Sequence, residues 1–123
     1  MPERRDVAQF LNDFKAAVSL EYVCWLRRMD DAKEHLSGLQ INRNEAIEIL
    51  HGLTADNYCR GPEPDDFEPN RDIWIFGWDV AGTEAYIKLT LQQDPRRRTV
   101  IHAVIWSFHA AEHPLRYPLR QLS

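Results

Sequence analysis

The chain has 123 residues, of which 44% are hydrophobic and 28% charged, and its net charge is −4. These values are typical of one globular domain that folds without disulfides or a structural metal. No apolar run approaches the ~18 residues of a membrane span, and "MPERRDVAQF" at the start lacks the apolar core of a secretion signal. The two cysteines, Cys24 and Cys59, form no C-x-x-C pair, so we expect a cytoplasmic protein with reduced thiols and no membrane partner.

The first part of the chain has helical periodicity. Apolar residues at steps of three and four predict an amphipathic helix over 4–18. Aromatic and β-branched residues favour a short strand within 20–28, and a short helix is predicted at 29–39. The clearest helix spans 42–53, where Asn42 and Glu45 make a capping-box pattern and Gly52 is a stop signal. The helical part therefore covers about residues 4–53.

The second part is predicted to be a sheet. Prolines, a glycine and acidic residues at 54–70 predict a loop. A period of two then predicts strands at 72–80, 84–92 and 99–109, joined by turns at Gly82 and Pro95. Such closely linked strands form an antiparallel meander. Helices followed by a sheet predict an α+β fold in one domain, 1–123, with the sheet part at about 72–109 and a tail at 110–123.

Alternation predicts which side chains share a face of the sheet. In the second strand, Ile87, Leu89 and Leu91 should face the helices, whereas Tyr86, Lys88 and Thr90 should face solvent or a ligand. The third strand is apolar on both faces, which predicts a central position. Its two faces would carry Ile101, Ala103 and Ile105 on one side and Val100, Val104, Trp106 and Phe108 on the other.

Two histidines of the third strand have different surroundings. His102 lies within the apolar run and is predicted to be structural. His109 ends the strand and begins His109-Ala-Ala-Glu112-His113, which matches the zinc-protease pattern H-x-x-E-H. That motif requires a helix, and Pro114 leaves room for barely one turn, so we expect no metal site and no cofactor. An imidazole can still transfer a proton near neutral pH without metal.

Charge is distributed unevenly along the chain. Residues 1–85 contain 9 Lys/Arg and 17 Asp/Glu, a net −8, whereas residues 86–123 contain 6 and 2, a net +4. A local basic field of this kind attracts phosphates. Arg96–Arg98 considered alone is more simply a solvated hairpin tip.

Four segments together resemble the MqsR family of bacterial toxins, the ribonuclease halves of type II toxin–antitoxin pairs. They are "GLTADNYCRGPEPD", "IWIFG", "EAYIKLTL" and "VIWSFHAAEHPLRYPLR", and the order of elements is similar over residues 8–120. The resemblance implies a RelE-like fold, a twisted antiparallel sheet with helices packed on one face. It also implies a metal-independent endoribonuclease that cuts messenger RNA and is neutralised by a cognate antitoxin.

The resemblance also implies particular site residues. Tyr86 and Lys88 match the tyrosine and lysine of the Y-I-K-L strand, and His109 takes the last position of S-F-K or S-F-H. Arg60 stands where the family has a lysine just after the tyrosine of L-T-x-x-x-Y. Ile75 replaces a glutamine found in some members, so that contact is not carried over. The tail "AAEHPLRYPLR" is absent from the shortest members.

These residues suit metal-free cleavage, in which the neighbouring 2′-hydroxyl of RNA is the nucleophile. The protein must then supply a base, an acid and positive charge. His109 is the natural base or acid, Arg60, Lys88 and Arg116 can bind the phosphate, and Tyr86 can stack a base or hold an oxygen.

The RNA-binding set is predicted to be completed by three further residues, Arg96, Arg97 and Tyr117. The alternative is a non-catalytic module that binds RNA or a protein with the same sheet face. In that case His109 would be a strand-terminal histidine bonded to Glu112.

Overall fold

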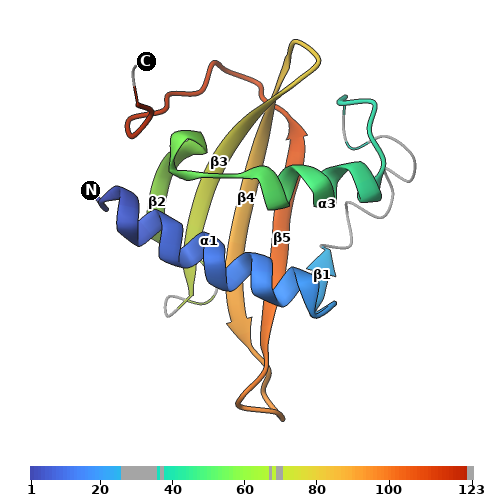
Figure 1. Cartoon of the computed structure of the whole chain (residues 1–123), viewed down its shortest axis with the longest axis vertical. Helices are drawn as coiled ribbons and strands as arrows, with labels where there is room; N and C mark the ends of the chain where they lie inside the picture. Colours follow the sequence, from blue (N-terminus) through green and yellow to red (C-terminus); the bar gives the residue numbers. More distant parts are fainter. Residues whose placement is uncertain (26–35, 37, 67, 69–70, 122–123) are drawn as a thin grey trace.

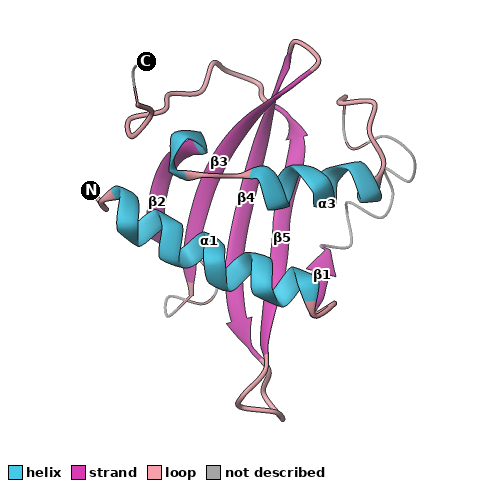
Figure 2. Cartoon of the chain, viewed as in Figure 1, coloured by secondary structure: helices cyan, strands magenta, loops and turns pink. Residues whose placement is uncertain are grey.

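The computed structural model describes residues 1–25, 36, 38–66, 68 and 71–121. Within them, two helices and a short 3-10 turn accompany one five-stranded sheet of order β1-β5-β4-β3-β2 (Figures 1 and 2). The helices are α1 (Arg4–Ser19) and α3 (Arg43–Gly52), and the turn is η1 (Ala55–Asn57). The strands are β1 (Val23–Trp25), β2 (Tyr58–Pro64), β3 (Asp72–Val80), β4 (Thr83–Gln93) and β5 (Ile101–Ala110).

The fold is α+β, and both helices cover the same face of the sheet (Figure 2). The predicted meander is β3-β4-β5, with antiparallel neighbours. The sheet is mixed rather than purely antiparallel, because β1 lies parallel to β5. No helix in the described part of the chain is long and apolar enough to cross a membrane.

Both helices begin and pack as their sequences predict. The apolar stripe of α1 is buried against the sheet and includes Phe10, Leu11 and Phe14. The side chain of Asn42 accepts a hydrogen bond from the Glu45 amide (2.9 Å), and the Glu45 carboxylate accepts one from the Asn42 amide (3.2 Å). This reciprocal cap satisfies two amides that have no partner within the helix. The helix predicted at 29–39 lies almost wholly outside the described residues.

The prediction of a loop at 54–70 was wrong for residues 55–64, which form η1 and β2. Prolines exclude a segment from the centre of a sheet but are tolerated on an edge, and β2 is an edge strand. Its pairing with β3 is irregular, with register shifts after Tyr58 and after Arg60. Tyr58 is 2% exposed and its ring lies edge-on to Trp74 and Phe76, so β2 belongs to the core.

An extra residue in β5 changes which side chains share a face. Lys88 pairs with Ser107 and Leu89 with Ile105, so Trp106 is inserted as a β-bulge. Simple alternation would place Phe108 on the face opposite Ile105, and His109 beside the helices. The bulge reverses both positions: Phe108 is buried in the helix-covered core, and His109 pairs with Tyr86 on the other face.

The face of the sheet away from the helices, called the open face here, is partly covered by the C-terminal tail. The tail leaves β5 and returns towards β2 and the start of α1 (Figure 1). The Leu115 amide and the Tyr117 hydroxyl both donate to the Glu84 carboxylate, at 2.8 and 2.7 Å. Gly77 lies beneath them, and a Cβ there would come within 2.3 Å of the Tyr117 oxygen. The tail thus packs so closely on Gly77 that any larger side chain there would overlap Tyr117 and Leu115.

Not every polar position of β4 faces solvent. Thr90 was predicted to face solvent or a ligand, but it is fully buried, and its hydroxyl donates to the carbonyl of Asp72. Ile75 is also buried on this side. Thr90 and Ile75 thus form a small buried layer on the open face, between its two ends.

Candidate functional site

The four residues predicted to be catalytic lie in two adjacent rows of the sheet. Arg60 pairs with Ile75, Ile75 with Lys88, and Lys88 with Ser107, which makes one row across β2, β3, β4 and β5. The next row on the same face pairs Tyr86 with His109. The sheet therefore brings two cations, a phenol and an imidazole to one region, although they come from distant parts of the sequence.

A pocket of about 390 Å³ opens at this place. Its floor is formed by Arg60, Tyr86 and His109 of the sheet, and its wall by residues 111–115 of the tail. Lys88 does not line the pocket and lies one row further along β4. The tail that the shortest members of the resembled family lack is thus part of this pocket.

His109 is held by two contacts. Its ring stacks on that of Tyr86, with centroids 5.1 Å apart and planes inclined by 18°. Its Nδ1 lies 2.8 Å from the carbonyl oxygen of Ala110. A carbonyl can only accept, so Nδ1 carries the hydrogen and Nε2 of the neutral ring keeps its lone pair. The partner expected in the non-catalytic alternative, Glu112, is not the one found.

Arg60 and Lys88, the cations of the site, make only weak contacts with the groups around them. The Arg60 Nε lies 3.2 Å from a Glu63 carboxylate oxygen, but both side chains are about half exposed, so this pair contributes little to stability. The Lys88 ammonium lies 5.3 Å from the centre of the Trp106 ring, a cation–π contact. A phosphate that binds here would therefore displace only a solvent-screened ion pair.

Tyr117 and Arg116 differ in how much their side chains are occupied by contacts within the protein. Tyr117 donates to Glu84, packs on Gly77 and has the Arg120 guanidinium 3.9 Å from its ring centre. Burial, with the Glu84 carboxylate second, raises the pKa of the Tyr117 hydroxyl. This residue anchors the tail rather than presenting an open ring to a base. Arg116 is exposed and follows Leu115, the last tail residue that lines the pocket.

The zinc-protease spacing does not lie on a helix. His109 is in β5, and Glu112 and His113 are in a bend of the tail. Within the described residues, no three His, Cys, Asp or Glu side chains are grouped in a way that could hold a metal ion. Glu112 and His113 nevertheless line the same pocket as His109.

Arg96 and Arg97 are at the other end of the sheet. They lie in the turn between β4 and β5, and the seven residue-to-residue steps of extended chain from Tyr86 to Gln93 span about 23 Å. Arg97 is engaged there, 3.4 Å from the Asp94 carboxylate and over the Tyr22 ring. The structure does not bring these two arginines to the pocket.

His102 belongs to that same end, and its bond to Asp94 agrees with the structural role predicted for it. Its Nε2 lies 2.9 Å from the Asp94 carboxylate, whose other oxygen accepts from the amides of Arg96 and Arg97. The hydrogen bond from His102, followed by these amides, lowers the pKa of Asp94. Asp94 thus holds together the two sides of the β4–β5 turn through His102 and the two backbone amides.

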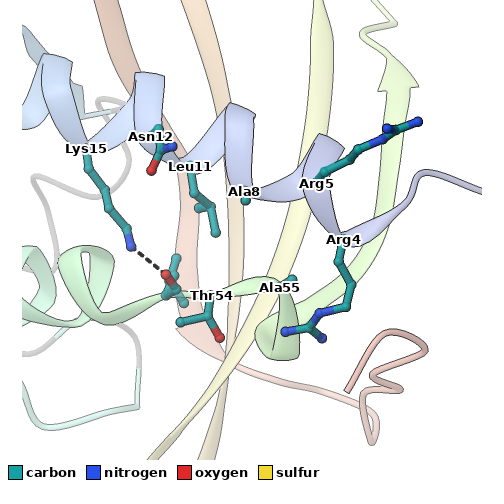
Figure 3. Close-up of a pocket in the computed structure, with 9 residues that line it drawn as sticks. Arg4, Arg5, Ala8, Leu11, Asn12, Lys15, Thr54 and Ala55 are labelled. Carbon is teal, nitrogen blue, oxygen red and sulfur yellow. Dashed lines mark hydrogen bonds between the residues drawn. The ribbon is translucent and has the colours of Figure 1, made fainter. Parts of the chain in front are cut away.

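A second pocket, between α1 and the segment before β2, contains cations that sequence reasoning did not single out (Figure 3). Lys15 donates to the Leu53 carbonyl at 2.6 Å, and Arg4 contacts the Asp56 carboxylate at 2.7 Å. Arg4 also donates to the Leu119 carbonyl of the tail. These cations connect α1 to its neighbours, and no acid–base pair accompanies them among the residues that line this pocket.

Comparisons of the chain with protein-family models, with curated proteins and with solved structures gave no match. Function is therefore inferred from the geometry of the pocket on the open face and from the resemblance of the sequence motifs.

Proposed function

We propose that this protein is a metal-independent endoribonuclease of MqsR type, with a RelE-like fold, that cleaves messenger RNA. The observation that supports the proposal most directly is the pocket on the open face. It combines an imidazole with a free Nε2 lone pair, a phenol and a guanidinium, with the Lys88 ammonium one row away. These are the groups that RNA cleavage through the 2′-hydroxyl requires.

The reaction follows from these positions. His109 accepts the proton of the 2′-hydroxyl, and O2′ attacks phosphorus as the bond from phosphorus to O5′ breaks. The products are a 2′,3′-cyclic phosphate and, once the leaving O5′ has taken a proton from an acid or from water, a 5′-hydroxyl. Arg60 and Lys88 stabilise the negative charge that develops on the phosphate oxygens, and the Tyr86 hydroxyl can bind one of them.

The biological role is proposed from the resemblance alone. In this role the enzyme is the toxin of a type II toxin–antitoxin pair, and its partners are messenger RNA and a cognate antitoxin. The expected phenotype is growth arrest when the toxin is produced by itself, and recovery when the antitoxin is produced with it.

A long messenger RNA incubated with the purified protein tests the enzymatic part. We expect cleavage that persists in EDTA, is lost in His109→Ala and is unchanged in His51→Ala. His51 is a matched control because it is exposed at the end of α3, on the other side of the sheet. Cleavage abolished by EDTA would contradict the metal-independent mechanism. RNA that is retarded on a gel but intact would favour the alternative, a non-catalytic binding module that uses the same face.

A further inference from the structure

We infer that His113, in the tail, is a second catalytic residue of the proposed ribonuclease and protonates the leaving 5′-oxygen while His109 acts on the 2′-hydroxyl. The inference rests on the proposed function. It assigns a role to the last residue of the H-x-x-E-H spacing, which neither a metal site nor the resemblance to MqsR explains.

Cleavage requires two proton transfers at separate places. The attacking and leaving oxygens lie on opposite sides of phosphorus in an in-line displacement, so one imidazole cannot serve both in the same step. The pocket offers two imidazoles from different segments, His109 on the sheet floor and His113 on the tail wall. A phosphate between floor and wall can contact both.

The position of His113 is fixed although it lies in a tail. Glu84 binds the chain on both sides of it: the Glu84 carbonyl accepts from the Ala111 amide (2.8 Å), and its carboxylate accepts from the Leu115 amide (2.8 Å). Pro114, which follows His113, restricts the backbone further. Such pre-organisation is what a residue needs to act on a bound substrate.

The two histidines also differ in what their surroundings let them do. The Nδ1 hydrogen of His109 is committed to the Ala110 carbonyl, which leaves Nε2 to accept a proton. His113 is exposed and can hold a hydrogen on both ring nitrogens, the form that donates. Proton flow is balanced, since the base gains the 2′-hydroxyl proton and the acid gives one to O5′.

The other ionisable groups that face His113 are less suited to be the acid. They are Arg60 from β2, Tyr86 from β4, His109 from β5 and Glu112 from the tail. A guanidinium keeps its protons, a phenol ordinarily titrates near pH 10, and a carboxylic acid is ordinarily ionised at neutral pH. Histidine is the side chain that exchanges a proton near neutrality.

An RNA with sulfur in place of the bridging 5′-oxygen, at a bond that the wild-type protein cuts, separates the two roles. A thiolate leaves without being protonated, so its departure needs no acid. We expect His113→Gln to cleave normal RNA about 10²–10⁴-fold more slowly than wild type and to cleave the sulfur substrate at nearly the wild-type rate. His109→Gln should be slow on both substrates, and His51→Gln normal on both.

The dependence of the rate on pH gives a second measurement. An acid must be protonated to act, so the wild-type rate should fall at high pH, and His113→Gln should lose that fall. The inference is overturned if His113→Gln cleaves normal RNA at the wild-type rate, or if it is equally slow on both substrates. Either result leaves the proposed function standing as long as the wild-type protein cuts RNA, whereas a wild-type protein that cuts neither RNA overturns both.

Discussion

The two ends of the sheet each contain a histidine of β5 with arginines close by, yet their chemistry differs. At the β4–β5 turn, His102 binds the Asp94 carboxylate, and that carboxylate also holds two backbone amides. At the opposite end, the His109 ring bonds to the neighbouring Ala110 carbonyl, stacks on Tyr86 and lines a pocket with Arg60. The partner of each imidazole, rather than the residue type, decides whether it closes a turn or is available to a substrate.

The largest expected effect comes from replacing each of these two histidines with alanine and comparing the two variants. His109→Ala should lower the rate of RNA cleavage about 10²–10⁴-fold, because it removes a general base. His102→Ala should leave that rate nearly unchanged but lower the free energy of unfolding, since it removes the 2.9 Å contact between His102 and the Asp94 carboxylate. Cleavage rates and urea unfolding of the two variants make the comparison, and equal losses of cleavage would contradict the separation of the two ends.

The next effect tests whether the tail is part of the site. Gly77→Ala places a Cβ 2.3 Å from the Tyr117 oxygen and 2.8 Å from the Leu115 Cδ1, so these two side chains of the tail must shift. We expect about 1–3 kcal/mol of destabilisation and slower cleavage, because the wall formed by residues 111–115 is displaced.

A double variant serves as the control for that prediction. In Gly77→Ala/Tyr117→Ala the overlap with the Tyr117 ring is gone, so the loss of stability should be smaller than the sum of the two single losses. Additive losses in urea unfolding would show that Gly77 and the tail do not interact.

The sequence predicted α1, α3 and the meander, because these depend on local periodicity and capping. The resemblance of the motifs, not periodicity, pointed to Arg60, Tyr86 and His109, which are three of the residues that line the pocket. It could not predict the face of His109. Alternation along β5 assigns that residue to the helix side, and only the inserted Trp106 reverses it. A bulge depends on the register between two strands, which leaves no mark in the spacing of a single strand.

Two other features depended equally on tertiary contacts. The strand Tyr58–Pro64 contains prolines that favour a loop, and it exists because an edge position tolerates them and Tyr58 packs in the core. The tail has little periodicity, and its path is set by Glu84, which is 31 residues from Leu115 in sequence. The H-x-x-E-H spacing was the available signal for Glu112 and His113, although it suggested different chemistry.

The role of Asp94 at the β4–β5 turn can be tested by measuring how protein stability depends on pH. The pKa of Asp94 is lower in the folded protein than its ordinary value of 3.8, first because of His102. Its ionised form therefore stabilises the fold above about pH 4, and that stabilisation is lost as the pH falls further. In urea unfolding, the difference between wild type and Asp94→Asn should be largest near pH 7 and shrink below pH 4. Asp66→Asn, a substitution at an exposed carboxylate, is the control. A difference in the free energy of unfolding between wild type and Asp94→Asn that does not change with pH would contradict the ionic role of Asp94.

The smallest expected effect concerns the arginines of the same turn. A charge about 23 Å from the pocket is more than two screening lengths away at about 0.1 M salt, so it contributes little to binding there. We expect Arg96→Ala/Arg97→Ala to change the cleavage rate by no more than about twofold. Arg60→Ala, which removes a charged contact with the phosphate, should lower the cleavage rate about 10- to 100-fold.

Rates measured over a series of salt concentrations compare the double variant with Arg60→Ala, because each lost phosphate contact reduces the salt dependence of binding. A loss in the double variant as large as that in Arg60→Ala would mean that RNA extends along the whole open face to the turn, and that the two ends of the sheet act as one binding surface.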